Sequence, residues 1–342
     1  MNKYEIQTVL KGDGSDWDHA REPHLKDDEL RAIYATMVRV RMLNERGMNL
    51  QRQGRIGFYI GSEGQEAVHV GGAAALEARD WYFPHYRDPG VALFRGTTIE
   101  NMVHQLYGNG KDIIKGRQMP NHFSFKDQNF FSISSPLTVR VPQAVGAAYG
   151  MLYKKTGQVA MSSFGDGSTS EGDFHVGLNF AGVWKAPCVF LLNNNQYAIS
   201  VPSHMQTASA TYAQKAEAYG FEGIRVDGND VLAVYAACKM ATDKARAGKG
   251  PTLIECFTFR MGPHSSSDDP KRYVNPNDLQ FWGAQDPIFR FRNYLVKKGV
   301  WNDKLEAELV ENTKNEIQAA ILSAEEAGAP PLRDLITDVY AE

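Results

Sequence analysis

The sequence has few cysteines, no long apolar run and no large excess of charge of either sign. Its three cysteines, Cys188, Cys238 and Cys256, lie far apart among 342 residues, so they match neither a zinc-ligand spacing nor a disulfide framework. A reducing compartment, the cytoplasm, is therefore expected. No stretch approaches the roughly 20 apolar residues that cross a membrane, and the N-terminus resembles neither a signal peptide nor a transit peptide.

The charge balance argues against nucleic acid as a partner. Lys and Arg number 37 and Asp and Glu number 40, which gives a formal net charge of −3. A protein that neutralises many phosphates of DNA or RNA needs a basic excess instead. Hydrophobic residues make up 43% of the chain and charged residues 23%, a composition that indicates an ordinary globular protein.

The pattern of apolar residues predicts an α/β protein. A helix is expected from Asp27, where apolar residues recur at helical spacing behind an acidic turn: Leu30, Ile33, Tyr34, Met37 and Val38. Apolar stretches then alternate with helical ones, giving strands at 159–164, 188–193, 223–228 and 251–259 and helices at 65–77, 99–107, 142–155, 173–185 and 231–247. The strand CVFLLN shows no polar alternation, as expected of parallel strands buried on both faces. We therefore predict a doubly wound, mostly parallel sheet flanked by helices.

The chain divides into three expected parts. Residues 1–26 form a leading arm, residues 27–284 the α/β domain, and residues 285–342 a helical extension with a long charged helix at 303–327. Pro142 suits the first position of its helix, and the small residues that follow it favour close helix packing.

Polar residues follow two successive predicted strands and provide the strongest chemical signal. Gly165, Asp166 and Gly167 follow one strand, and Asn194 and Asn195 follow the next, with the 26 residues 168–193 between them. Neighbouring parallel strands lie about 4.8 Å apart, so oxygens at their carboxyl ends can share one cation. A carboxylate, an amide oxygen and a nearby backbone carbonyl are ligands that suit Mg²⁺.

The same segment predicts an anion site beside the metal. The two glycines allow close backbone approach, and a helix expected over 168–185 would offer unpaired N–H groups at its amino end. GDG alone is common in turns, but GDG with NN one crossover later predicts a diphosphate and metal site.

GDG and NN at this spacing resemble the signature of thiamine diphosphate enzymes. Further motifs resemble the alpha subunits of two-component 2-oxo acid dehydrogenases over roughly 28–340: GRQMP, ISSPL, PQAVGAAYG, SEGDFH, NNQYAIS, RVDGNDV and HSSSDDP. YGNGKDIIKGRQMP, RVDGNDVLAVY and GPHSSSDDP are most similar to the branched-chain, or 2-oxoisovalerate, branch. The pyruvate and acetoin branches remain the alternatives.

The resemblance implies a role for individual residues. The metal ligands fall on the carboxylate of Asp166, the amide oxygen of Asn195 and the main-chain carbonyl of Tyr197. Diphosphate contacts fall on the side chains of Tyr86, Arg87 and His264 and the backbone of Gly167 and Ser168. His264 is also the expected catalytic residue, and Ser135 to Leu137 would contact the aminopyrimidine ring. Without the resemblance, Arg87 would be an ordinary loop cation and His264 an ordinary structural histidine.

The substrate pocket is expected around Phe58, Tyr59 and Ile60, which could equally be plain core, and around His85. Three departures from the branched-chain pattern stand out. Asn193 replaces an arginine found on the diphosphate in some relatives, His85 replaces a glutamine, and Val139 and Arg140 replace two residues of a potassium site. Ser265 occupies the place of a serine that a regulatory kinase modifies in eukaryotic relatives.

The implied reaction is oxidative decarboxylation of a 2-oxo acid, with transfer of the acyl group to a lipoyl arm. In this family a separate beta subunit supplies the glutamate that activates the cofactor, so we expect an alpha2-beta2 assembly, an inactive isolated chain and a lipoyl acyltransferase partner. A Mg²⁺-dependent nucleotide hydrolase is disfavoured because GNGKD and GKGPT lack the GK[ST] of a phosphate loop. A non-catalytic scaffold subunit would not require Asp166, Asn195, Arg87 and His264 together.

Overall fold

A five-stranded parallel sheet forms the centre of the computed structural model, which describes residues 4–338. Its strand order is β3-β4-β5-β9-β8. The strands are β3 (Trp81–Phe83), β4 (Ala160–Gly165), β5 (Cys188–Asn194), β8 (Glu222–Asp227) and β9 (Thr252–Phe257). Every neighbouring pair is parallel, which confirms the predicted doubly wound α/β architecture.

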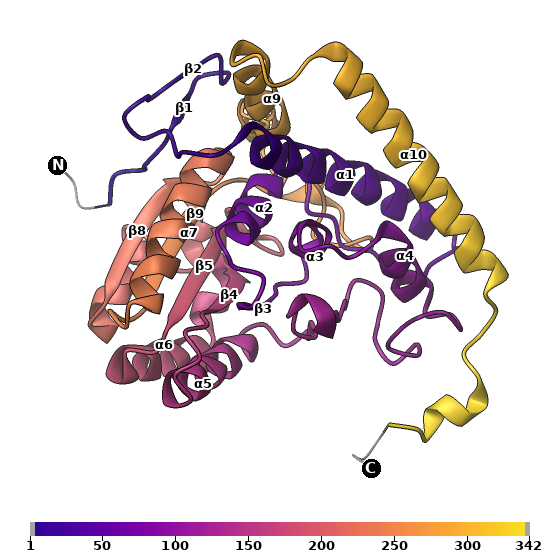
Figure 1. Ribbon diagram of the computed structural model, residues 1–342, viewed down its shortest axis with the longest axis horizontal. Helices are drawn as coiled ribbons and strands as arrows, with labels where there is room; N and C mark the ends of the chain where they lie inside the picture. The colour runs from indigo at the N-terminus through magenta and orange to yellow at the C-terminus, as the bar shows by residue number, and fades with distance from the viewer. Residues whose placement is uncertain (1–3, 339–342) are drawn as a thin grey trace.

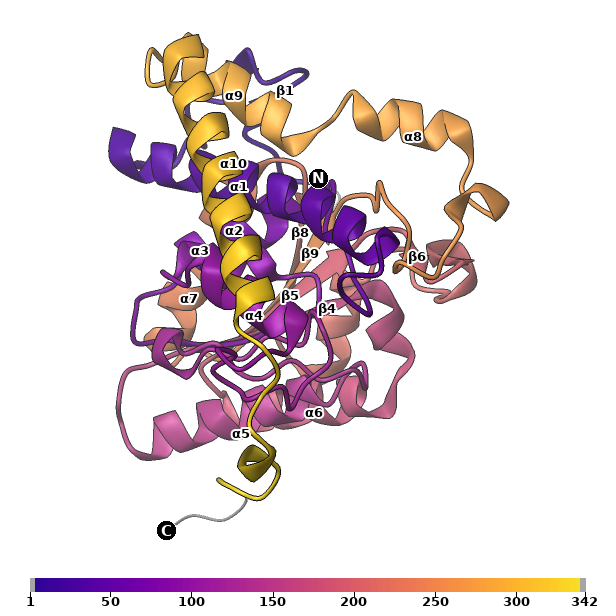
Figure 2. The same ribbon diagram turned by 90° about the vertical axis from the view of Figure 1, so that its right-hand side faces the viewer.

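Helices cover both faces of the sheet (Figure 1, Figure 2). On one face lie α5 (Arg140–Tyr153) and α6 (Gly172–Trp184), and on the other lie α2 (Glu66–Ala74) and α7 (Val231–Arg246). Phe190 and Leu192 of β5 pack with the first pair of helices, whereas Leu191 packs with the second. Each side chain of the strand is buried whichever way it points, which explains why the sequence shows no alternation there.

Two helix starts differ from the prediction. α5 begins at Arg140, so Pro142 is its third residue; the first-turn N–H groups lack helical partners, and proline costs little there. After β4 the chain forms a 3-10 turn, η2 (Asp166–Ser170), and α6 begins only at Gly172. Close packing of α5 and α6 depends on Gly177, where a Cβ atom would lie 2.6 Å from Val141 Cγ1.

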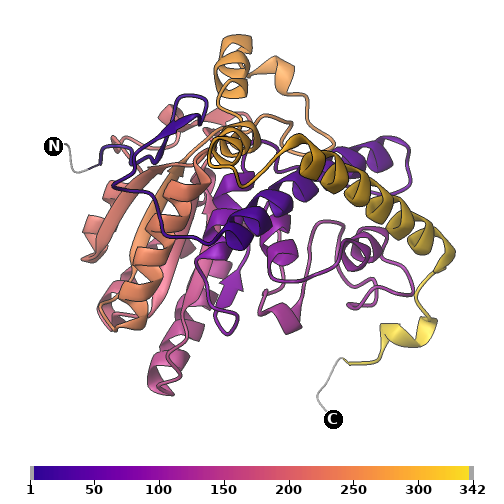
Figure 3. The ribbon, with the colours of Figure 1, turned by 45° about the horizontal axis from the view of Figure 1, so that its top comes forward.

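The remaining helices surround this core. They are α1 (Asp27–Arg52), α3 (Pro89–Phe94), α4 (Ile99–Tyr107), α8 (Pro276–Gly283), α9 (Pro287–Lys297) and α10 (Asp303–Glu326). α10 packs against α1 and α4 (Figure 3). The prediction missed β3, α3 and α8, all of which are short. Among the described residues, no helix is both long enough and apolar enough to span a membrane.

The N-terminal arm is bound to the sheet domain. Gln7 pairs with Val226 at the outer edge of β8, and the hairpin of β1 (Leu10–Lys11) and β2 (Asp16–Trp17) follows. Asp230 caps α7 with one carboxylate oxygen and accepts the N–H groups of Val9 and Leu10 with the other, each at 2.6 Å. The arm is therefore held by the same carboxylate that begins α7.

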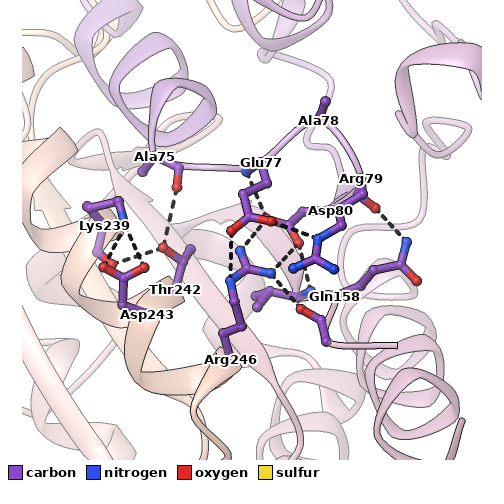
Figure 4. A network of polar contacts seen from close by, with 12 residues as sticks. Ala75, Glu77, Ala78, Arg79, Asp80, Gln158, Lys239, Thr242, Asp243 and Arg246 are labelled. Carbon is purple, nitrogen blue, oxygen red and sulfur yellow. Dashed lines mark hydrogen bonds and ion pairs between the residues drawn. The ribbon is translucent and has the colours of Figure 1, made fainter. Parts of the chain in front are cut away.

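An ion pair between the buried Asp80 and the partly exposed Arg246 lies at the amino edge of the sheet (Figure 4). Asp80, which precedes β3, accepts hydrogen bonds from Arg246 Nη1 and Nη2 at 3.0 and 2.7 Å. The same carboxylate accepts the N–H of Val159, the residue before β4, at 2.9 Å. Asp80 thus joins the starts of two strands to the last turn of α7, at the edge opposite the carboxyl ends of the strands.

Candidate active site

A cavity of about 390 Å³ lies at the carboxyl ends of β4 and β5. Gly165 and Asn193 are paired in register at these ends, so the polar turns that follow the two strands adjoin one another, as predicted. The cavity brings together most of the site residues predicted from the sequence: Phe58, Ile60, His85, Tyr86, Arg87, Ser135, Leu137, Asp166, Gly167, Ser168, Asn195, Tyr197 and His264.

Asp166 contributes a buried carboxylate to the cavity wall. Its residue is 1% exposed, and burial raises the pKa of the carboxyl above its ordinary value. Oδ2 accepts hydrogen bonds from Gln206 Nε2 at 2.7 Å and Ser203 Oγ at 3.4 Å. Both donors are neutral, and no cationic side chain of the described residues pairs with this carboxylate within 4.0 Å. A buried anion without an ion partner is a suitable place for a cation.

Two further oxygens come from residues that line the same cavity, Asn195 and Tyr197. The amide of Asn195 is buried; its Nδ2 donates to Gln65 Oε1 at 3.0 Å, and its Oδ1 accepts from Tyr197 N at 3.3 Å and retains a second lone pair. The backbone carbonyl of Tyr197, in β6 (Tyr197–Ala198), accepts Arg260 Nη1 at 3.2 Å and retains a second lone pair. β6 pairs with β7 (Val201–Pro202), and this small hairpin approaches Gly167 closely: a Cβ atom at Gly167 would lie 2.8 Å from Ala198 Cβ.

Arg87 contributes a buried cation. The residue is 1% exposed, and burial lowers the pKa of the guanidinium to about 10. Nη1 donates to Gly61 O at 2.5 Å, and Nη2 donates to His264 O at 2.7 Å. Within the described residues the guanidinium has no carboxylate partner, although the ring of Tyr86 lies beneath it with its centroid at 5.3 Å. The cavity therefore contains one unpaired anion and one unpaired cation.

His264 is neutral in this setting. Its Nδ1 lies 3.1 Å from Arg87 Nη2, and because arginine only donates, Nδ1 accepts and the ring proton is assigned to Nε2. Burial, together with the charges of Arg87 and Arg260, lowers the pKa of the imidazole to about 3. The ring can accordingly donate a hydrogen bond from Nε2–H near neutral pH.

The loop after His264 is held by hydrogen bonds within the chain. Ser266 exchanges two with Tyr59: Ser266 N donates to Tyr59 O at 2.9 Å, and Tyr59 N donates to Ser266 Oγ at 3.2 Å. Asp268 Oδ2 accepts His264 N at 2.7 Å and also the hydroxyl of Tyr273, which in turn accepts Arg260 Nη2 at 2.7 Å. These contacts order a segment that composition alone would assign to a flexible loop.

Comparison with known proteins identifies the family. Residues 34–333 match the family described as the dehydrogenase E1 component. The chain belongs to this E1 family. It is 44% identical to the mitochondrial 2-oxoisovalerate dehydrogenase subunit alpha of Caenorhabditis elegans over 339 residues, which are 98% of this chain and 78% of that protein. The human subunit is 40% identical over 338 residues, covering 98% and 76% of the two chains. Subunit alpha 2 of Arabidopsis thaliana is 40% identical over 333 residues, covering 97% and 71%.

Membership of the E1 family implies thiamine diphosphate as the cofactor, and the residues present fit it. A diphosphate suits the unpaired guanidinium of Arg87, and a divalent cation suits the unpaired carboxylate of Asp166. The hydroxyl of Ser168 is buried without a hydrogen-bond partner and adds an unused polar group to the same wall. The charges and polar atoms of this E1 site therefore complement a metal diphosphate.

The structure places Tyr59 outside the cavity. Its ring is buried, and its hydroxyl donates to Asn44 Oδ1 at 3.0 Å. Phe58 and Ile60, the neighbours of Tyr59 in the predicted pocket wall, line the cavity, whereas Tyr59 packs in the core. Its contribution to the site is through its backbone, which holds Ser266.

Sequence reasoning missed several cavity residues, of which His122 is the most informative. His122 Nε2 lies 2.6 Å from Ser135 Oγ, and Nδ1 lies 3.1 Å from Pro120 O. A carbonyl only accepts, so Nδ1 carries the proton and Nε2 accepts from Ser135. The motif GRQMP ended two residues before His122, and nothing in its spacing marked the histidine. Met119, Ala198 and Ile199 also line this E1 site.

The departures from the branched-chain pattern lie in or beside the site. Asn193 is fully buried, and its Nδ2 donates to Gln65 Oε1 at 2.9 Å. His85 lines the cavity, and burial together with Arg140 lowers the pKa of its ring well below the ordinary value. Arg140 is buried at the start of α5, and its Nη2 donates to Ser134 O at 2.9 Å.

Proposed function

We propose that this chain is the alpha subunit of a 2-oxoisovalerate dehydrogenase that oxidatively decarboxylates branched-chain 2-oxo acids and passes the acyl group to the lipoyl group of an acyltransferase. The observation that carries this proposal is the near full-length identity of 40 to 44% to proteins of that name, joined to a cavity that suits a metal diphosphate. A pyruvate or acetoin dehydrogenase alpha subunit is the alternative.

Thiamine diphosphate would be held through Mg²⁺ on Asp166 Oδ, Asn195 Oδ1 and the carbonyl of Tyr197. Hydrogen bonds from Tyr86, Arg87 and His264 and from the backbone of Gly167 and Ser168 would hold its phosphates. Ser135 and Leu137 line the cavity where the aminopyrimidine ring is expected. When bound, the cofactor supplies the carbon centre that attacks the 2-oxo group and accepts the electrons released with CO₂.

The protein's own contribution is orientation and proton placement. Arg87 Nη2 donates to the backbone carbonyl of His264 and contacts Nδ1 of its ring. These two contacts fix the orientation of the ring and therefore of its Nε2–H group. A neutral imidazole near the diphosphate can donate a hydrogen bond from Nε2–H to a developing oxyanion and keep its proton. We therefore expect the catalytic contribution of His264 to depend on the position of its ring and on the lowered pKa that keeps the ring neutral.

The apolar part of the wall favours an aliphatic substrate. Phe58, Ile60, Met119 and Leu137 line the cavity and would surround a branched side chain. His85 lines the same cavity, so it is the residue to change when substrate preference is tested. One methylene group changes the discrimination between two substrates by only about 1–3 kcal/mol. Substitution of one residue that lines the cavity could therefore shift the preference from 2-oxoisovalerate toward pyruvate.

A beta subunit would complete the site. Among the described residues that line the cavity there is no glutamate, the residue type that the resemblance assigns to the beta subunit. The outer surface of α5 and α6 is apolar and aromatic, and Gly146 and Gly150 on it have no neighbour within 4 Å of an added Cβ. The exposed apolar and aromatic residues of these two helices include Tyr149, Tyr153, Phe180, Val183 and Trp184. We assign this surface to subunit contacts in an alpha2-beta2 assembly, because a patch of this kind indicates a protein partner.

We propose that residues 27–284 form the cofactor domain and residues 285–342 a helical extension, in which α10 packs against α1 and α4.

We also propose a cytoplasmic location, which three buried, unpaired cysteines support; the relatives are mitochondrial by name.

The deciding experiment measures decarboxylation by the co-expressed alpha and beta chains, with 2-oxoisovalerate or pyruvate, in the presence and absence of thiamine diphosphate and Mg²⁺. We expect preference for 2-oxoisovalerate, dependence on both additives, and loss of turnover in Asp166→Ala and in the isolated alpha chain. Preference for pyruvate would overturn the substrate, and turnover without the cofactor would overturn the mechanism.

A further inference from the structure

Gln65 binds two asparagines at the carboxyl end of β5 and is not among the residues that line the cavity. Its Oε1 accepts two hydrogen bonds, from Asn193 Nδ2 at 2.9 Å and from Asn195 Nδ2 at 3.0 Å. All three side chains are buried, with exposures of 0, 0 and 4% for Gln65, Asn193 and Asn195. Gln65 directly precedes α2, and its side chain makes no cap bond to that helix, so the amide is available for this contact.

Two contacts determine which end of the Asn195 amide is the oxygen: Gln65 Oε1 accepts from Nδ2 at 3.0 Å, and the longer bond from Tyr197 N reaches Oδ1 at 3.3 Å. An amide has a donor end and an acceptor end, and Gln65 takes the donor end of Asn195. Turning the amide over would place its oxygen against Gln65 Oε1 and would present N–H groups in place of the ligand oxygen. N–H groups repel a cation, so a turned Asn195 could not bind one.

The orientation of Gln65 is itself determined by its neighbours. Two N–H donors, one from Asn193 and one from Asn195, converge on one atom, and only an oxygen satisfies both. Gln65 Nε2 is left buried without a partner. The pair of asparagines thus orients Gln65, and Gln65 in turn orients Asn195.

We propose that Gln65 is a positioning residue for the metal site, acting through the amide of Asn195. The inference rests on the proposed metal role of Asn195. It also gives Asn193 a role in this chain: where some relatives have an arginine, Asn193 supplies the second donor that holds Gln65 in place.

Three variants separate this role from a purely structural one. Gln65→Met keeps the length of the side chain and removes the oxygen. Gln65→Glu keeps an oxygen that can accept from both asparagines. Gln105→Met is the matched control. Gln105 lies on α4, is similarly buried at 4%, hydrogen-bonds to the backbone of Ser124 and does not line the cavity.

The experiment measures metal binding directly. The co-expressed alpha and beta assembly is stripped of metal, saturated with thiamine diphosphate and titrated with Mn²⁺, whose free concentration is followed by electron paramagnetic resonance. Loss of a partner that orients a ligand typically weakens metal binding about 10- to 100-fold, and we expect this for Gln65→Met. Gln65→Glu should bind Mn²⁺ close to the wild-type affinity, and Gln105→Met should match wild type.

Mn²⁺ binding by Gln65→Met at wild-type affinity would overturn the inference, and so would binding by Gln65→Glu that is as weak as that of Gln65→Met. If Gln65→Met does not assemble, Gln65→Asn withdraws the oxygen by one methylene and serves in its place. Asp166→Ala tests the metal site separately from Gln65. If Asp166→Ala binds Mn²⁺ like wild type, the proposed metal site is wrong. If Asp166→Ala loses Mn²⁺ binding but Gln65→Met does not, the metal site stands and only the role of Gln65 is wrong.

Discussion

One guanidinium nitrogen of Arg87 holds both the backbone and the ring of His264. Nη2 donates to His264 O at 2.7 Å and lies 3.1 Å from Nδ1. This contact sets the tautomer of the ring and opposes its protonation, because a second positive charge would lie beside the first. Arg87 is in the segment after β3 and His264 follows β9, so the relationship exists only once the sheet has formed.

The suppressed pKa of His264 predicts how stability depends on pH. An unfolded histidine has a pKa of about 6.5, whereas the pKa of His264 is lowered to about 3, chiefly by burial. Between these values the unfolded chain binds a proton that the folded chain does not. The contribution of His264 to stability is therefore fully present above about pH 6.5 and is lost as pH falls toward 3. We expect His264→Gln to reduce the difference in thermal unfolding midpoint of the assembly between pH 7 and pH 5.

The control for this measurement is His19→Gln, because the His19 side chain is 75% exposed. It should leave the pH dependence of the midpoint as in wild type. An unchanged slope in His264→Gln would show that the ring is not kept neutral by the fold.

Gly167 is expected to tolerate no side chain, because a Cβ atom there would lie 2.8 Å from Ala198 Cβ. Overpacking of this kind costs about 1–3 kcal/mol, and here it would displace the hairpin that carries the carbonyl of Tyr197. Gly167→Ala should weaken thiamine diphosphate binding, measured by titration in Mg²⁺. Adding Ala198→Gly should restore it, and Gly172→Ala, with no atom within 4 Å of the new Cβ, should have no effect. Failure of the double variant to recover would place the cause elsewhere.

Asp80 is expected to support the fold and not the reaction. Asp80→Ala would leave Arg246, which is 18% exposed, with Glu77 as its remaining ion partner at 3.2 Å, and would leave the buried N–H of Val159 without its acceptor, a loss that alone costs about 1–3 kcal/mol. Asp80→Ala should therefore lower the unfolding midpoint strongly while the turnover of the folded assembly is retained. Asp243→Ala is the control from the same region (Figure 4): its partner Lys239 is half exposed, and such pairs contribute about 0–1 kcal/mol. Lost turnover in Asp80→Ala at a temperature where it is folded would contradict this division.

Arg140 is expected to make added potassium unnecessary. Its guanidinium is buried and donates to the carbonyl of Ser134, next to the segment that lines the cavity. Because a fixed positive charge already serves this carbonyl, decarboxylation by the assembly should proceed equally in potassium and choline salts of equal ionic strength. Arg140→Gln should lower the rate in choline, and a wild-type enzyme that requires potassium would contradict the prediction.

Much of the fold could be predicted from the local pattern. The boundaries of the central strands and of α4, α7 and α10 agree with the prediction within one or two residues, because apolar periodicity and capping residues act over short distances. β3, α3 and α8 were missed because three to eight residues carry too little pattern. The helix predicted over 173–185 agrees with α6 within one residue, whereas the start at 168 expected for the anion site was wrong because η2 occupies that turn.

The amino-acid sequence by itself determined the spacing of Asp166 and Asn195 and the apolar strands that bring them to one edge. Only the tertiary structure decided the rest. These are the contacts of His122 with Ser135 and of Gln65 with Asn195, and the burial of Tyr59 in the core. Each joins segments that are separate in the sequence, and local hydrophobic periodicity does not predict which segments become neighbours. The physical reason is burial. An isolated carboxylate or guanidinium has a large desolvation free energy only when the fold removes it from water. A metal ion and a diphosphate offset that free energy, which is why the folded site suits them.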